Sequence, residues 1–273
     1  MKNVVVIPWI EREEAVNSSG IGKANRTKGY QYGVNSWKHW CEKNNVEFFL
    51  LDTLLVPESE MVITWQRWYV LEILENNGIS YDQVLLVDAD SLIHPDCPNF
   101  FKETNHEYSV VLNNGCYEWV TRSINGWHHH LFPNEVKPKV WEYHNAGFVI
   151  VNKKHKDFFD KVKDFYLNNI NEINDIRLNK QYQGLNICSY GQTIINFLLI
   201  KHNIKRTFLS EKYNMTDLFR KNLLHNPGQS WWPDELIFLE TAWIYQFAAI
   251  PGGDNNPRGC SYWMKRTYEE LYG

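Results

Sequence analysis

Two aspartates separated by one alanine, Asp88-Ala89-Asp90, follow a strongly apolar run of the sequence. The run at 84–87 (VLLV) is typical of a buried strand, which would bring both acids to the edge of a sheet. Two neighbouring carboxylates repel each other, and burying them is costly. A divalent cation such as Mg²⁺ or Mn²⁺ relieves this repulsion and also takes oxygen ligands from phosphates. The pair therefore predicts a metal and phosphate site, and the competing interpretation is a pair of surface turn residues.

Short apolar runs that predict strands alternate along the chain with stretches that predict helices. Alternation of this kind is typical of a mainly parallel sheet covered by helices on both faces. Ligands in such sheets bind beyond the carboxyl ends of the strands, where the two aspartates would lie. We therefore predict an α/β fold with a mixed, mainly parallel central sheet flanked by helices, forming one domain over residues 1–273. The expected strands are 3–7, 46–51, 84–87, 108–112 and 147–151, and the expected helices are 27–44, 60–75, 154–169, 190–202 and 262–272.

Composition and charge narrow the functional classes. The chain has 28 basic and 32 acidic residues and a formal net charge of −4, which does not provide the basic surface of a general nucleic-acid binder. Five widely spaced cysteines without a C-x-x-C pair are typical of a reduced intracellular protein. No apolar run is long enough for a signal peptide or a transmembrane segment. We therefore expect a cytoplasmic protein with no nucleic-acid partner and no membrane span.

Aromatic residues are unusually frequent, with 12 Trp, 15 Tyr and 14 Phe among 273 residues. Two stretches rich in them, 115–141 and 223–234, show little periodicity, and long aromatic loops are usually lids or binding surfaces. Trp127, Trp231 and Trp232 would either stack on sugar rings or close the core under a loop.

Four segments of the sequence resemble motifs of the GT-A nucleotide-sugar glycosyltransferases, in the layout of glycogenin and the bacterial lipopolysaccharide galactosyltransferases. Residues 81–90 (YDQVLLVDAD) resemble the D-x-D strand of this family. Residues 144–152 (HNAGFVIVN) resemble its F-N-[AS]-G strand, and 190–196 (YGQTIIN) resemble its D-Q-x-x-[IVL]-N helix start. Residues 244–247 (IYQF) stand where the family has an I-x-H-[FY] strand. The motifs keep the family's order along most of the chain.

The resemblance implies the GT-A fold and transfer of a sugar, with retention of anomeric configuration, to a hydroxyl of a glycan or another acceptor. The donor would be a nucleoside diphosphate sugar, for which we expect UDP, and the cofactor would be Mn²⁺ (or Mg²⁺). The implied metal ligands are Asp88, Asp90 and Gln246, and the implied catalytic residues are Gln192 and Asn145. The expected donor-binding residues are Ile7, Pro8, Trp9, Arg67, Asp88, Ala89, Asp90, Ala146, Gly147 and Arg258.

Two positions depart from the family's pattern. Gly191 replaces the Asp that precedes the helix Gln, which puts contacts to the donor sugar or the acceptor in doubt. Gln246 replaces the metal-binding His. An amide oxygen can ligate a hard cation but is a poorer ligand than imidazole for transition metals. We therefore expect a weaker or less manganese-selective site, unless another group such as His225 completes the ligand shell.

Several alternatives remain open on sequence grounds. An inverting enzyme would need an acidic general base, for which Asp234 and Glu235 are candidates, although acids also favour a helix N-terminus. A nucleotidyltransferase would need a basic, Gly-rich loop where the acidic segment 10–14 stands. A non-catalytic carbohydrate- or nucleotide-binding module would suit the aromatic excess. The histidines at 128–130 predict ordinary loop imidazoles, because three consecutive residues rarely converge on one ion.

Overall fold

The computed structural model describes residues 2–10, 26–178, 190–224, 236–250 and 258–273. The strands are β1 (Lys2–Pro8), β2 (Glu47–Leu51), β3 (Tyr81–Val87), β4 (Ser91–Ile93), β5 (Tyr108–Leu112), β6 (His144–Val151), β7 (Arg206–Leu209) and β8 (Ile244–Gln246). The α-helices are α1 (Tyr30–Asn44), α2 (Ile63–Gln66), α3 (Val70–Asn76), α4 (Tyr117–His130), α5 (Lys156–Leu178), α6 (Tyr190–Lys201) and α7 (Cys260–Tyr272).

Several residues considered in the sequence lie outside the described residues. They are the segment 11–14, Cys188, His225, Trp231, Trp232, Asp234 and Glu235.

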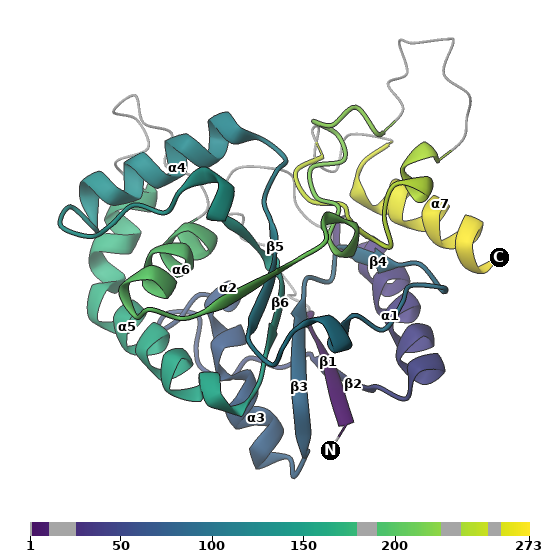
Figure 1. The fold of residues 1–273 in the computed structure, drawn as a ribbon, viewed down its shortest axis with the longest axis horizontal. Helices are drawn as coiled ribbons and strands as arrows, with labels where there is room; N and C mark the ends of the chain where they lie inside the picture. Colours follow the sequence, from purple (N-terminus) through teal and green to yellow (C-terminus); the bar gives the residue numbers. More distant parts are fainter. Residues whose placement is uncertain (1, 11–25, 179–189, 225–235, 251–257) are drawn as a thin grey trace. The chain divides into compact units, whose positions relative to one another are not determined.

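Six of the described strands form one mixed sheet in the order β2-β1-β3-β6-β5-β7 (Figure 1). The pairs β1–β2 and β5–β7 are parallel, whereas β5–β6 is antiparallel. Strands β4 and β8 form a separate antiparallel pair. A mainly parallel sheet flanked by helices confirms the predicted α/β fold class.

Internal contacts divide the described chain into two compact units, and each unit is assembled from separate segments. The first unit comprises Thr53–Leu85 and Thr104–Leu209. The second unit comprises Lys2–Asp52, Leu86–Glu103 and Ser210–Gly273. The expectation of a single glycosyltransferase domain over the whole chain stays a prediction.

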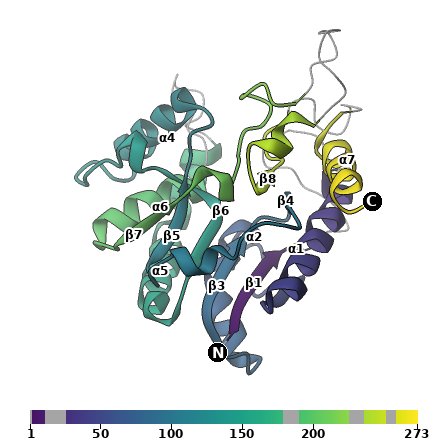
Figure 2. The ribbon, with the colours of Figure 1, turned by 45° about the vertical axis from the view of Figure 1, so that its right-hand side comes forward.

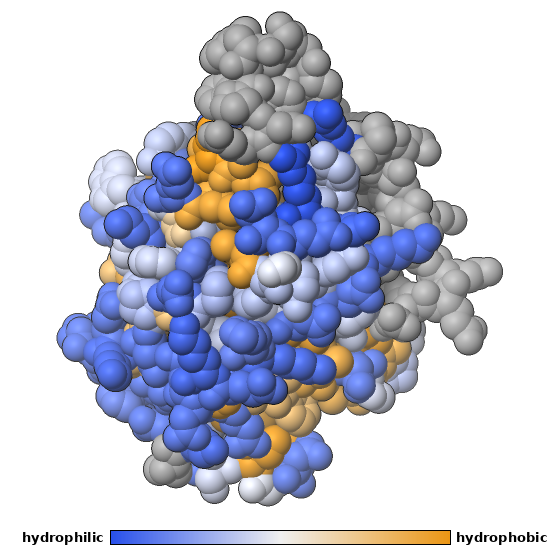
Figure 3. Space-filling model, turned by 90° about the vertical axis from the view of Figure 1, so that its right-hand side faces the viewer, coloured by the Kyte–Doolittle hydropathy of each residue, from blue (hydrophilic) through white to orange (hydrophobic). Residues whose placement is uncertain are grey.

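In the second unit, α1 contacts β1, β2, β4 and α7 (Figure 2). Its indoles Trp37 and Trp40 are fully buried, and the Trp40 ring stacks on Phe100 at 5.0 Å between ring centroids. The face drawn in Figure 3 is mostly hydrophilic with limited apolar areas, as expected when large apolar side chains fill a core.

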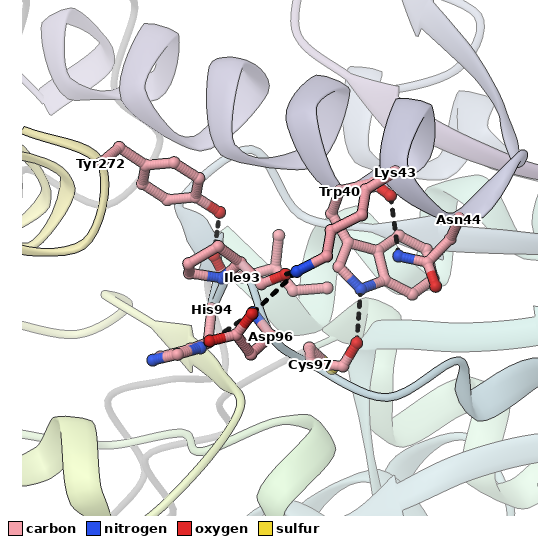
Figure 4. A network of polar contacts seen from close by, with 9 residues as sticks. Trp40, Lys43, Asn44, Ile93, His94, Asp96, Cys97 and Tyr272 are labelled. Atoms are coloured by element: carbon pink, nitrogen blue, oxygen red, sulfur yellow. Dashed lines mark hydrogen bonds and ion pairs between the residues drawn. The ribbon is translucent and has the colours of Figure 1, made fainter.

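Polar contacts tie the end of β4 and the segment after it to helices α1 and α7 (Figure 4). Trp40 Nε1 donates to the carbonyl of Cys97 at 2.8 Å, and Lys43 Nζ lies 2.7 Å from Asp96 Oδ1. The Tyr272 hydroxyl donates to the carbonyl of Ile93 at 2.5 Å. Three carbonyl or carboxylate groups of one short segment thus find partners on two helices, which holds β4 in place.

In the first unit, α6 contacts β6, α4 and α5 (Figure 1). The predicted aromatic loop over 115–141 is wrong in its first half, because α4 occupies residues 117–130. Val120, Ile124 and Trp127 recur at i, i+4 and i+7 and are all buried, which is the spacing of one helix face. Trp127 therefore belongs to the core, and the histidines at 128–130 form the last turn of α4 rather than a loop.

Among the helices that the structure describes, none combines the length and the apolar character that crossing a bilayer requires.

Candidate active site

The aspartate pair lies in the second unit, in the turn that joins β3 to β4. The Ser91 hydroxyl donates to the carbonyl of Asp88 at 2.7 Å, which closes this turn. Trp37 Nε1 in turn donates to Ser91 Oγ at 3.1 Å, so a buried indole of α1 fixes the hydroxyl that closes the turn. A helix pattern in the sequence indicates which face is buried but not where an indole N–H points, so this positioning role of Trp37 could not be predicted.

Helix α1 approaches the same turn so closely that only glycine fits at position 33. A Cβ on Gly33 would lie 2.5 Å from the carbonyl oxygen of Ser91 and 2.6 Å from that of Ala89. Both distances are far below contact distance and both involve backbone, which cannot move without moving the turn. Gly33 thus sets the position of the backbone that carries the two carboxylates.

The third predicted metal ligand, Gln246, is brought to the aspartates by β8. Antiparallel pairing sets Gln246 opposite Ser91, and the Phe247 N–H donates to the carbonyl of Asp90 at 2.8 Å. Gln246 Nε2 donates to Asp88 Oδ2 at 2.9 Å and lies 3.4 Å from Asp90 Oδ1. Asp90 is 7% exposed and Gln246 is 2% exposed, whereas Asp88 is partly exposed to solvent. One amide nitrogen therefore serves both carboxylates.

The donor set of this cluster fits a hard divalent cation. Gln246 Oε1 is buried and has no hydrogen-bond partner among the described residues. The oxygen and nitrogen of a side-chain amide are nearly equal in size, so turning the amide over exchanges them. In that orientation two carboxylates and one amide oxygen would face a common point, and Mg²⁺ and Mn²⁺ take such ligands. Within the described residues no group of three His, Cys, Asp or Glu side chains is arranged to hold a metal.

The residues predicted to contact the nucleotide also belong to the second unit. Ile7 and Pro8 end β1, and the Trp9 N–H donates to the carbonyl of Leu51 at 2.9 Å. The Trp9 ring meets Tyr30 edge-on, at 6.3 Å between centroids. Arg258 lies just before α7, and its guanidinium is 6.0 Å from the centroid of the Tyr262 ring.

The remaining predicted residues form a second cluster, in the first unit, around the peptide groups of Ala146. Arg67 Nη1 donates to the carbonyl of Ala146 at 2.7 Å. The backbone N–H of Ala146 donates to Gln192 Oε1 at 3.0 Å. Asn145 Oδ1 accepts the Gly147 N–H at 2.6 Å. The structure thus brings Arg67, Asn145, Ala146, Gly147 and Gln192 together at the start of β6.

The start of β6 is fixed to α6 by a buried amide. Asn196 Oδ1 accepts the N–H of His144 at 3.0 Å, and Asn196 Nδ2 donates to the carbonyl of the same residue at 3.1 Å. The His144 ring is fully buried, and burial, with the nearby charge of Arg206, lowers its pKa to about 3. The imidazole is therefore neutral at physiological pH, and it packs edge-on against Tyr108.

Comparison with known proteins identifies the fold. No family model matches the sequence, and no curated protein matches it. A solved glycosyltransferase involved in the glycosylation of the major capsid of PBCV-1 has a TM-score of 0.53 and 10% identity, over 99% of this chain and 100% of its own. The WbbM bifunctional glycosyltransferase has a TM-score of 0.51 and 14% identity, over 100% of this chain and 52% of its own.

The glycosyltransferase GlyE of Streptococcus pneumoniae TIGR4 has a TM-score of 0.45 and 13% identity, over 98% of this chain and 63% of its own. This chain therefore spans all of the first matched structure but only about half to two thirds of WbbM and GlyE. The likeness to the first glycosyltransferase and to WbbM, whose TM-scores exceed 0.5, establishes the fold. The chain has the fold of the GT-A glycosyltransferases, as its motifs predicted.

Proposed function

We propose that this chain is a metal-dependent glycosyltransferase that moves a hexosyl group from a UDP-sugar to a hydroxyl of a glycan or another acceptor, with retention of anomeric configuration. The observation that carries the proposal is the cluster of Asp88, Asp90 and Gln246 at the end of β3, in a chain with this fold. Asp90 is buried and Asp88 is partly exposed, so the repulsion between their two negative charges is only partly screened by solvent, and a bound cation would offset it.

In this proposal Asp88 and Asp90 hold Mn²⁺ or Mg²⁺, with Gln246 contributing Oε1 after its amide turns over. A bound cation would neutralise the negative charge that develops on the leaving diphosphate. Trp9, at the end of β1, offers an apolar face to the base, and Arg258 supplies a fork of donors that matches phosphate oxygens. Arg67 has the same chemistry, although it already donates to the carbonyl of Ala146.

Retention is supported by the chemistry of Gln192. An inverting transfer needs an acidic residue that takes the proton of the attacking hydroxyl. The amide of Gln192 cannot take that proton, and its Oε1 is fixed by the N–H of Ala146. A side chain held in this way can position the sugar and stabilise charge by hydrogen bonding. We therefore assign Gln192 and Asn145 to the region of the anomeric carbon.

A thermal-shift screen with UDP, GDP, CDP and ADP, each with and without Mn²⁺, tests the proposal. A ligand that binds only the native state raises the apparent melting temperature. We expect a metal-dependent shift with UDP that is lost in Asp90→Ala, followed by UDP-sugar hydrolysis that Asp88→Ala abolishes. Full activity in Asp88→Ala, or no shift with any nucleotide, would overturn the assignment.

A second candidate function is a non-catalytic carbohydrate- or nucleotide-binding module. It is favoured by the Gln246 amide, which donates to both carboxylates and so provides part of the compensation that a cation would give. This candidate predicts nucleotide or glycan binding that is indifferent to metal, with no hydrolysis of any donor. Metal-dependent hydrolysis would exclude it.

A further inference from the structure

A buried indole N–H in the first unit lacks a hydrogen-bond partner within the part of the chain that the structure describes. Trp65, on α2, is fully buried, and its ring packs against Tyr166 with 4.5 Å between centroids. Its Nε1 is closed to solvent and has no hydrogen-bond partner among the described residues. Leaving a buried donor unpaired costs about 1–3 kcal/mol. A missing acceptor is the simplest physical reason for such a group.

The start of α6 leaves room for that acceptor. A methyl group added at Gly191 would meet only one described heavy atom outside its own helix and chain neighbours, namely Trp65 Nε1 at 3.7 Å. Gly191 is the second residue of α6, and the positive end of a helix dipole favours an oxygen with negative charge near the first turn.

Two more donors belong to residues that hydrogen-bond to Ala146. Gln192 Nε2 is buried without a partner among the described residues, and the bond from the Ala146 N–H to Oε1 fixes which end of the amide is the donor. Arg67 also contacts Ala146, through the bond from its Nη1 to the carbonyl oxygen. The obvious acceptor, Asn145 Oδ1, is already used by the Gly147 N–H. We call Trp65 Nε1, Gln192 Nε2 and the Arg67 guanidinium the donor cluster.

We propose that the donor cluster selects a transferred sugar that carries an oxygen able only to accept hydrogen bonds, either the carboxylate of a uronic acid or the carbonyl of an acetamido group. This inference rests on the proposed function, because it assigns the sugar for that reaction. A hydroxyl in the same place would have to donate its own proton, and the cluster offers it no acceptor. A site built from donors discriminates strongly against groups that cannot satisfy them.

Titration calorimetry with UDP, UDP-glucose, UDP-N-acetylglucosamine and UDP-glucuronate in the presence of Mg²⁺ tests the inference. We expect UDP-N-acetylglucosamine or UDP-glucuronate to bind at least tenfold more tightly than UDP-glucose, and the preferred one identifies the group. Equal affinity for all three sugars, with UDP itself bound, would overturn the inference and leave the proposed function standing. No binding of UDP would overturn the proposed function and the inference with it.

Two variants test the cluster itself. Trp65→Phe removes the N–H but keeps a buried ring, so it should reduce the preference at least severalfold while UDP affinity stays unchanged. Gly191→Asp places an internal acceptor beside Trp65 Nε1, and Gly191→Asn adds a side chain of the same size without the charge. The preference should be lost in Gly191→Asp and reduced less in Gly191→Asn. A preference that survives both Trp65→Phe and Gly191→Asp, in proteins with native melting temperatures, would overturn the assignment.

Discussion

The ligand atom at position 246, an amide oxygen in the proposed site, should influence whether the site prefers Mg²⁺ or Mn²⁺. An all-oxygen ligand set suits Mg²⁺ as well as Mn²⁺, whereas an imidazole nitrogen favours the transition metal. We predict that Gln246→His raises Mn²⁺ affinity roughly tenfold, the scale of change seen when a metal site is retuned, and leaves Mg²⁺ affinity equal or lower. Electron paramagnetic resonance of free Mn²⁺ gives the first value, and competition with Mg²⁺ gives the second. Parallel gains for both metals would argue against a ligand role for this residue.

The carboxylate of Asp90 should lower the stability of the protein without metal. It is 7% exposed and shares one amide donor with Asp88, so repulsion between the two charges is poorly screened. We predict that Asp90→Asn raises the melting temperature of the metal-free protein by about 2–4 °C, equivalent to about 1 kcal/mol, and abolishes the further rise that Mn²⁺ and UDP give the native sequence.

A matched control for this variant lies on β3, the strand that leads into the aspartate turn. Asp82→Asn changes a carboxylate whose side chain is 45% exposed, so its charge is well solvated. This variant should leave both the metal-free melting temperature and the ligand-induced shift unchanged. Stabilisation by both variants would point to net charge rather than to the local pair.

The sequence located these residues but not the direction of their polar atoms. Asp88 and Asp90 were found because a buried apolar strand leads into them, and Gln246 was found by motif position. Whether the amide presents its nitrogen or its oxygen depends on carboxylates 158 and 156 positions away in the sequence. Trp65 and Gly33 were not singled out, because their roles come from a missing partner and a close approach. Neither property leaves a pattern in a single sequence.

At the scale of elements, continuous apolar runs in the sequence predicted the strands well. The helices, whose sequences mix apolar and polar residues, were predicted less well. β5 occupies the expected 108–112, whereas β3 begins three residues before the expected 84, because Tyr81 and Gln83 are also buried. The helix expected at 60–75 is broken into α2, a 3₁₀ turn at Arg67–Tyr69 and α3. The missed helix α4 shows that aromatic residues outside the apolar face obscure a helical period.

Helix α1 should tolerate no side chain where it meets the aspartate turn. We predict that Gly33→Ala costs about 1–3 kcal/mol of unfolding free energy, the usual range for overpacking, because the added methyl would overlap the backbone of Ala89 and Ser91. The displaced turn should also weaken Mn²⁺ binding. Asn35→Ala, at an exposed position of the same helix, is the control and should change neither quantity. Urea unfolding and a Mn²⁺ titration measure both, and a fully stable Gly33→Ala protein would contradict this packing.

The cap that follows β6 should make stability depend on pH. Burial and the charge of Lys154 lower the pKa of His155 to about 4, and its Nδ1 accepts the Asn152 N–H at 3.1 Å, which requires the neutral ring. In the unfolded chain, histidine binds a proton below about pH 6.5. The stability that the neutral His155 ring contributes is therefore complete above that pH and is lost as the pH falls towards 4. The same sign holds for His144.

We therefore predict that the unfolding free energy rises with pH between 4.5 and 6, and that His155→Gln reduces this slope by about 1.4 kcal/mol per pH unit, the limit for one proton. Urea melts at several pH values give the slopes. His39→Gln, which alters an exposed histidine of α1, is the control for the loss of a histidine. An unaltered slope in His155→Gln would show that its ring is protonated alike in both states.

For the whole molecule, the path of the chain links the stability of the two units. The chain passes between them at residues 52–53, 85–86, 103–104 and 209–210, so neither unit is one continuous segment. Strand β3 itself contains residues of both units. The segments of each unit are joined by stretches of chain that belong to the other unit, so unfolding one unit would turn these folded connections into long flexible loops. Closing such loops is part of the entropic cost of folding, and the remaining unit would be less stable. We therefore predict a single cooperative unfolding transition.

Buried cysteines provide a probe of that transition in the second unit. Burial raises the pKa of Cys41 to about 12 and also raises the pKa of Cys97, so neither thiol should react with iodoacetamide until the unit opens. Hydrogen exchange of the β5 amides reports on the first unit. Pulse labelling along a urea gradient, resolved by peptide mass spectrometry, should give the same midpoint for the two thiols and for β5. Two separate midpoints would mean that each unit is stable without the other, and the closed loops would then contribute little to the stability of either unit.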